Sequence, residues 1–266
     1  MRRLIIAFAV VAFIGPLLSG QISQAGSIVY VCDHSGNIGA VDVDSGTVTD
    51  LIDVGTTFWD IAFDPDGNLY GLTGSTLYSV NRVTSSVQAI GEHGIPAANA
   101  FVIHPDGTAY AAGENSTSLY TVNLQTGAAT AHHDTGKYAN GDLAFHGGRL
   151  YMTTKQKTPL PATYYLVDVD LTGGGTAREV MQLPEATFYG MDTADDGNLY
   201  VFRSTYAYSV DLINETLTPT ANWYRNGLNL AYGASTPIPE PSTVASLLSL
   251  GIVGLIGYWW RRRKAA

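Results

Sequence analysis

Short apolar stretches separated by polar turns fill the middle of the chain, with the two-residue alternation typical of β-strands. Four segments share one pattern, in which an apolar strand, a tight turn and a strand ending in Tyr follow one another: 60–70, 101–110, 142–151 and 191–200. A further strand ending in Val-Asn or Val-Asp follows each segment, and a fifth copy, Ile38–Asp42, precedes them all. The valines of this further strand (Val41, Val80, Val122, Val167 and Val210) recur every 39–45 residues. A period of this length with several short strands per unit is typical of a β-propeller.

Each repeat is expected to form a blade of four strands, the fourth being a segment such as 47–53 or 86–90. The first repeat, which starts at Ser27, lacks the innermost strand. At the other end of the domain, Leu228–Tyr232 matches Trp59–Phe63 of the second repeat position by position. We therefore predict an all-β fold: a propeller of five four-stranded blades over residues 26–236, in which this C-terminal strand enters the first blade and closes the ring.

Two other architectures agree with parts of the pattern. A β-sandwich or an open β array would use the same short strands, but it gives the spare C-terminal strand no reason to exist. A six-bladed ring would result if residues 152–188 contain a degenerate blade.

The two ends of the chain differ from the repeats. Residues 1–25 have a basic start, an apolar run and small residues before Gly26, which predicts a secretory signal peptide. At the other end, residues 237–266 contain Pro239-Glu240-Pro241, an uncharged segment over 244–260 and a basic cluster over 261–264. Seventeen helical residues extend about 25 Å, just enough for a bilayer core, so a single C-terminal transmembrane helix is expected. The basic cluster places its far end in the cytoplasm.

This C-terminal segment resembles the PEP-CTERM sorting signal of Gram-negative, exopolysaccharide-producing bacteria. The resemblance covers about the last 30 residues, with Pro239, Glu240 and Pro241 as the sorting motif. It implies a partner, a membrane transpeptidase of the exosortase type, and a precursor anchored in the inner membrane that is later delivered to the cell surface or extracellular matrix. The repeats resemble secreted propellers with Asp-Pro-Asp-Gly turns, which implies the fold alone because propellers carry many functions.

Charge narrows the choice of partners. The whole chain has a formal net charge of −9. Without Glu240 and the six terminal bases, 22 acids and 8 bases remain, so the exported domain carries −14. This acidity argues against a nucleic-acid partner, which would require a basic surface. The single cysteine, Cys32, excludes an internal disulfide and a Cys-rich zinc site, and its apolar strand predicts a buried, inert thiol.

Candidate site residues lie in the loops that lead into the inner strands, because these loops gather at one mouth of a propeller. Aromatic side chains beside Asn and Asp in these loops could stack on a surface polysaccharide or bind Ca²⁺. The predicted face contains Trp59, Asp60, Asn99, Asp142, Tyr189, Trp223 and Asn229. The other interpretation of these residues is packing between blades for the aromatics and capping of strand ends for the polar groups.

Two functions follow from this pattern. We favour a non-enzymatic binding or surface-interaction module, for which no catalytic residue and no cofactor is assigned. The alternative is a Ca²⁺-dependent, lactonase-like propeller hydrolase with Asp60, Asp142 and Asn229 around the channel mouth. Ala100 and Gly190 occupy the corresponding positions of two other repeats and argue against it, and no Gly-x-Ser-x-Gly motif is present.

Overall fold

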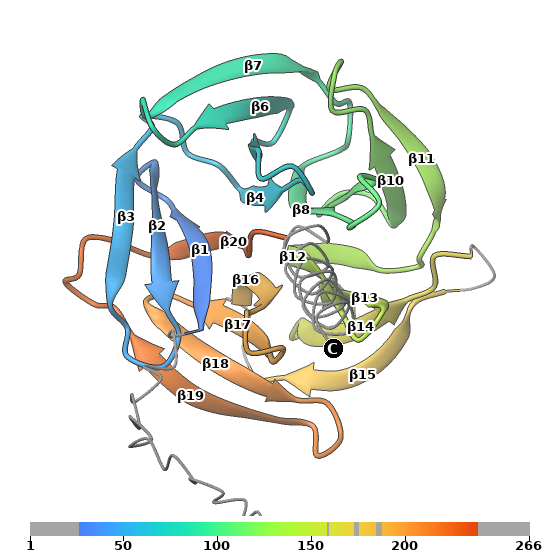
Figure 1. Cartoon of the computed structure of the whole chain (residues 1–266). Helices are drawn as coiled ribbons and strands as arrows, with labels where there is room; N and C mark the ends of the chain where they lie inside the picture. The colour runs from blue at the N-terminus through green and yellow to red at the C-terminus, as the bar shows by residue number, and fades with distance from the viewer. Residues whose placement is uncertain (1–26, 159, 173–175, 185–187, 239–266) are drawn as a thin grey trace, which may run out of the picture.

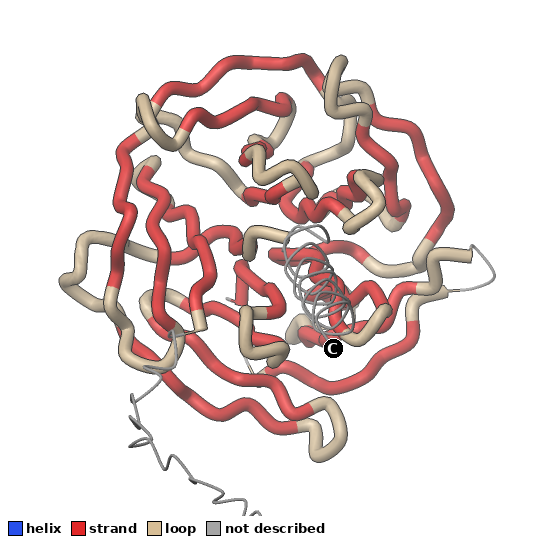
Figure 2. The backbone as a smooth tube through the Cα atoms, viewed as in Figure 1, coloured by secondary structure: helices blue, strands red, loops and turns tan. Residues whose placement is uncertain are grey.

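A computed structural model describes residues 27–158, 160–172, 176–184 and 188–238. In this part of the chain, 20 strands form five four-stranded antiparallel sheets around a central axis (Figure 1). The described residues contain strands, turns and loops and no helix (Figure 2). The predicted all-β propeller of five blades is confirmed, and the strands within residues 152–183 belong to the fourth blade rather than to a sixth.

In each blade, the strands follow one another from the axis outward in the order given below. Blade one contains β20 (Ala231–Ser235), β1 (Ile28–Asp33), β2 (Asn37–Asp42) and β3 (Val48–Asp53). Blade two contains β4 (Asp60–Phe63), β5 (Leu69–Leu72), β6 (Thr76–Asn81) and β7 (Ser86–Glu92). Blade three contains β8 (Ala98–Ile103), β9 (Ala109–Gly113), β10 (Ser118–Val122) and β11 (Ala129–Asp134). Blade four contains β12 (Tyr138–His146), β13 (Arg149–Gln156), β14 (Thr163–Val169) and β15 (Arg178–Leu183). Blade five contains β16 (Phe188–Thr193), β17 (Leu199–Arg203), β18 (Tyr206–Asp211) and β19 (Thr216–Asn222).

The Asp-Pro-Asp-Gly segments are turns between the first two strands of a blade. In blade two the Asp64 carboxylate accepts the backbone N–H groups of Asp66 and Asn68, and Gly67 has a φ of 80°. This left-handed conformation favours glycine. The acidic turn residues therefore shape the hairpin.

The apolar core lies between neighbouring blades. In the cluster between blades one and two, Tyr30 and Ile38 pack with Ile61 and Phe63, and four similar clusters fill the other blade contacts. Because every blade is buried against two others, the ring over residues 27–238 contains its own core, and we expect it to fold without the flanking segments.

The C-terminal strand closes the ring, as predicted, but in a different register. β20 pairs with β1 over Ala231–Ser235, with Gly233 opposite Cys32. The predicted strand, Leu228–Tyr232, is therefore wrong by three residues. Leu228 is instead a buried core residue that precedes the strand. The error arose because the inner strand is built from small residues, so the larger apolar residues before it gave the better match to the repeat.

The strand directions define two faces of the ring. The inner strands all begin at one face, the mouth face, and end at the other, the tail face, where the chain continues from Ser235 to Ile238. β1 runs antiparallel to β20, so its first residue also lies at the tail face. The described chain thus begins and ends on the same side of the ring. The predicted signal peptide, the Pro239–Pro241 motif and the predicted transmembrane helix lie outside the described residues, and no helix long and apolar enough to cross a membrane occurs among those described.

Candidate ligand site on the propeller axis

Five equivalent inner-strand positions meet at the axis. The strand registers place Gly233, Asp60, Ala100, Asp142 and Gly190 at the same height, one from each blade. Asp60 and Asp142 are fully buried there. The three small residues leave room for the two carboxyl groups: a Cβ at Gly233 would lie 2.2 Å from Asp60 Oδ1.

The two carboxyl groups accept an inward backbone N–H from every blade. Asp60 accepts the N–H groups of Ile61 and Phe101, with N···O distances of 2.8 and 2.6 Å. Asp142 accepts those of Leu143, Met191 and Ala234, at 2.6, 2.7 and 3.2 Å. Buried N–H groups without acceptors would be costly, so this pair stabilises the centre of the ring.

Asp60 and Asp142 also hydrogen-bond to each other, which requires a proton on one of them. Burial, followed by the neighbouring Asp142 charge, raises the pKa of Asp60 well above its ordinary value. Asp142 accepts three N–H groups against two for Asp60, and such bonds favour the ionised form. Burial likewise raises the pKa of Asp142 well above its ordinary value, so both carboxyl groups of the pair hold protons more tightly than exposed aspartates do.

A pocket of about 240 Å³ opens above this pair on the mouth face. In each blade, the residue directly before the axial position lines the pocket. These five residues are Tyr232, Trp59, Asn99, Gly141 and Tyr189. Glu114, Asn140 and Lys155 complete the lining. Because these residues come from all five blades, the pocket lies on the axis.

The aromatic side of the pocket is formed by blades five, one and two. Trp59 stacks on Tyr232 with ring centroids 5.8 Å apart, and Tyr189 meets Tyr232 edge-on at 6.1 Å. Trp59 is nevertheless 48% exposed. An exposed indole held by a neighbouring ring offers a preformed apolar surface to a ligand.

The opposite side is polar and belongs to blades three and four. Lys155 Nζ lies 3.6 Å from the Glu114 carboxylate, and the Lys157 ammonium donates to the Glu114 backbone carbonyl at 2.8 Å. Asn99 is only 8% exposed, and its Oδ1 accepts no hydrogen bond within the described part of the chain. An acceptor buried in this way favours a ligand that carries a donor.

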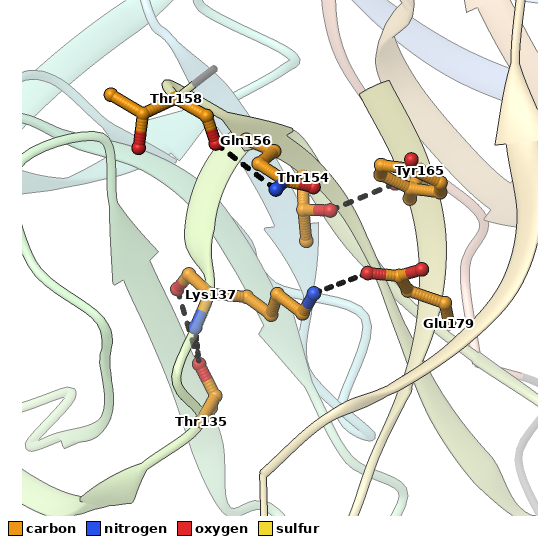
Figure 3. Close-up of polar contacts among 7 residues, drawn as sticks. All are labelled: Thr135, Lys137, Thr154, Gln156, Thr158, Tyr165 and Glu179. Carbon is orange, nitrogen blue, oxygen red and sulfur yellow. Dashed lines mark hydrogen bonds and ion pairs between the residues drawn. The ribbon is translucent and has the colours of Figure 1, made fainter. Parts of the chain in front are cut away.

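Blade four holds the polar side in place through contacts around the β13–β14 hairpin, drawn in Figure 3. Thr154 Oγ1 donates to the carbonyl of Tyr165 at 3.1 Å, and Gln156 Nε2 donates to that of Thr158 at 3.0 Å. Lys137 at the start of the blade forms an ion pair with Glu179 on the outer strand. Lys155, which lies between Thr154 and Gln156, is thereby fixed on a braced strand.

The structure brings together three of the seven residues of the predicted face at the pocket, namely Trp59, Asn99 and Tyr189, and places Asp60 and Asp142 directly beneath them. Trp223 was wrongly assigned to this face. Its side chain is fully buried against Phe202, with ring centroids 6.0 Å apart, because the loop after β19 folds into the gap between blades five and one.

Asn229 was also wrongly assigned to the axis, because it precedes β20 and the axial residue of blade one is Gly233. The Asn229 side chain donates to Ser35 Oγ, and its backbone N–H donates to Asp33. Tyr232, Glu114 and Lys155 were not among the site residues predicted from the sequence. A signal for Tyr232 was present, since the dipeptide Tyr-Gly at 189–190 recurs at 232–233.

Two further pockets lie away from the mouth of the ring. A larger one of about 960 Å³ lies outside the ring along blades one and two and includes Asp50 and Arg82, which both contact the Tyr30 hydroxyl. A third of about 310 Å³ lies on the axis at the tail face, with Phe63, Phe145 and Ile238 in its lining. Within the described ranges, no three His, Cys, Asp or Glu side chains are grouped to hold a metal ion.

Comparison with known proteins agrees with this geometry at two levels. The ring resembles a chain of the nidogen–laminin complex (TM-score 0.52, 15% identity, 80% of this chain and 82% of that one). It also resembles a structural genomics protein of unknown function from Bacteroides thetaiotaomicron (TM-score 0.53, 14% identity, 80% and 66%). At such identities the likeness shows the fold alone. A search among curated proteins finds none that matches.

These observations define the protein as a five-bladed β-propeller. Residues 237–264 match the PEP-CTERM protein-sorting motif. The chain thus carries a PEP-CTERM signal directly after its propeller, which implies export, processing by an exosortase and a membrane-anchored precursor in a Gram-negative bacterium.

Proposed function

We propose that the protein is a non-enzymatic surface or matrix module that binds a glycan in its axial pocket. An aromatic wall facing a polar one suits a sugar ring, whose apolar face stacks while its hydroxyl groups form hydrogen bonds. The observation that carries the proposal is the exposed Trp59 indole, stacked on Tyr232 in a pocket that Asn99 also lines.

The same geometry gives little support to a Ca²⁺-dependent hydrolase. Asn229 does not share the position of Asp60 and Asp142, and the carboxylate oxygens of both aspartates accept backbone N–H groups of the ring. Using them as metal ligands or as a general base would leave buried N–H groups without acceptors.

Binding to arrayed oligosaccharides tests the proposed function. The ring over residues 27–238 is expected to bind a subset of neutral sugars, and Trp59→Ala to weaken that binding by roughly 1 kcal/mol, the contribution of one aromatic contact. Tyr206→Ala removes an exposed aromatic side chain outside the pocket and serves as the matched control. An array without any bound sugar would contradict the proposal.

The surface or matrix fate has a separate test in a host that contains the transpeptidase. Glu240→Ala is expected to block processing while membrane insertion continues, so the unprocessed chain accumulates in the membrane fraction. Intact mass decides the outcome: a surface-located wild-type protein that still ends at Ala266 would contradict sorting by this motif.

A further inference from the structure

We propose that the axial pocket binds the terminal sugar of a neutral glycan chain, not a stretch within the chain. This inference rests on the proposed function and narrows its ligand. Three features of the pocket support it: a floor closed by the axial aspartates, a wall formed by all five blades, and a lining whose one described cation is already paired.

The floor is closed by the pair at the centre of the ring. Asp60 and Asp142 fill the axis and are hydrogen-bonded to each other and to N–H groups of all five blades. A polysaccharide therefore has no path through the propeller along its axis. Any ligand group that enters the pocket from the mouth face must stop at this floor.

The wall is complete because every blade contributes to it. Trp59 is 48% exposed, whereas Asn99 on the opposite side is only 8% exposed and Gly141 is buried. The pocket is therefore open beside Trp59 and enclosed beside Asn99. A sugar in the middle of a chain is extended at both ends, and the wall obstructs at least one of them before the ring reaches Asn99.

The volume agrees with a single sugar unit. The pocket measures about 240 Å³, below the roughly 300–1,000 Å³ of sites that enclose a drug-sized ligand. One terminal residue fills it, and the rest of the chain extends outward past Trp59.

The charge favours a neutral sugar. Among the described residues that line the pocket there is one cation, Lys155, and it is paired with the Glu114 carboxylate. The floor below consists of two acidic side chains, Asp60 and Asp142, and offers no positive charge to an anionic group. A uronic acid or sulfated sugar would therefore approach a site without a free cation, in a domain whose net charge is already strongly negative.

The experiment compares the exopolysaccharide of the producing bacterium, separated into neutral and acidic fractions, before and after partial acid hydrolysis. Each broken linkage creates two new chain ends at constant mass. We expect the binding capacity per gram of the neutral fraction to increase in direct proportion to the number of ends. Trp59→Ala should raise the dissociation constant about fivefold on intact and hydrolysed material alike.

Each outcome decides a different point. Capacity that stays constant or decreases on hydrolysis, with Trp59 still required, would overturn end binding and leave glycan binding intact. A preference for the acidic fraction would overturn the assignment to neutral sugars. Absence of binding to every fraction would contradict the proposed function itself, and this inference with it.

Discussion

Asp60 of blade two and Asp142 of blade four lie together on the propeller axis and accept a backbone N–H from each of the five blades. The parallel inner strands direct these donors toward the axis, where no other strand can accept them. Two carboxyl groups on non-adjacent blades are sufficient because the other three axial residues are glycine or alanine. The same pair closes the floor of the ligand pocket.

The stability of the ring should fall as the pH rises. A carboxyl group whose pKa is raised on folding binds more protons in the folded state, so the free energy of unfolding decreases with increasing pH. Burial raises the pKa of Asp60, and it raises that of Asp192, near the tail face, to about 7. The loss therefore begins above about pH 4, the ordinary value, and continues through neutral pH, with a slope of about 1.4 kcal/mol per pH unit for each proton at its steepest. Urea unfolding between pH 4.5 and 9 measures it.

The variant Asp60→Asn distinguishes the contribution of the axial pair to this pH dependence from the contribution of Asp192. The amide donates to Asp142 at every pH, so the variant should lose less stability than the wild type as the pH rises, although it is less stable at pH 5 because an N–H acceptor is removed. Identical slopes in the two proteins would show that the pair does not share a proton.

Glycine is required at position 233 by the close approach of Asp60. A Cβ there would lie 2.2 Å from Asp60 Oδ1 and 2.5 Å from its Cα, so Gly233→Ala should destabilise the ring by about 1–3 kcal/mol. Gly74→Ala is the control, because a Cβ at that turn residue meets no atom within 4 Å. Equal melting temperatures of the two variants would contradict the register of β20.

The ligand pocket should point away from the membrane in the anchored precursor. The described chain begins and ends at the tail face, whereas the pocket lies on the mouth face. The only natural cysteine, Cys32, is buried, so single cysteines can be labelled at exposed turns: Ser75→Cys on the mouth face and Asp66→Cys on the tail face. With the full chain in liposomes, a quencher attached to the lipids should reduce the fluorescence of the label at position 66 more than at position 75. Equal quenching would contradict this orientation.

The repeat pattern was enough to predict the five blades, since alternating apolar residues and Gly-containing turns recur in each blade. It failed at β20, where Ala231, Gly233 and Ala234 are small because the centre of the ring is crowded, so hydrophobic periodicity carries little signal.

Trp223 shows a similar limit for predicting the site: an aromatic residue in a loop has the same sequence appearance whether the loop stays at the surface or folds into the core. Glu114 and Lys155 come from different blades, and only the closed ring brings them together.

The protection of Trp59 by a bound sugar is the most direct test of the account. Residues 27–238 contain two tryptophans, exposed Trp59 and buried Trp223, so acrylamide quenching of the indole emission reports mainly on Trp59. We predict that the neutral oligosaccharide that binds best on the array reduces this quenching in a saturable manner, and that Trp59→Phe, which retains an aromatic ring, abolishes the signal while binding measured by calorimetry persists. A sugar that binds by calorimetry and leaves the quenching of Trp59 unchanged would place the ligand elsewhere and contradict the axial site.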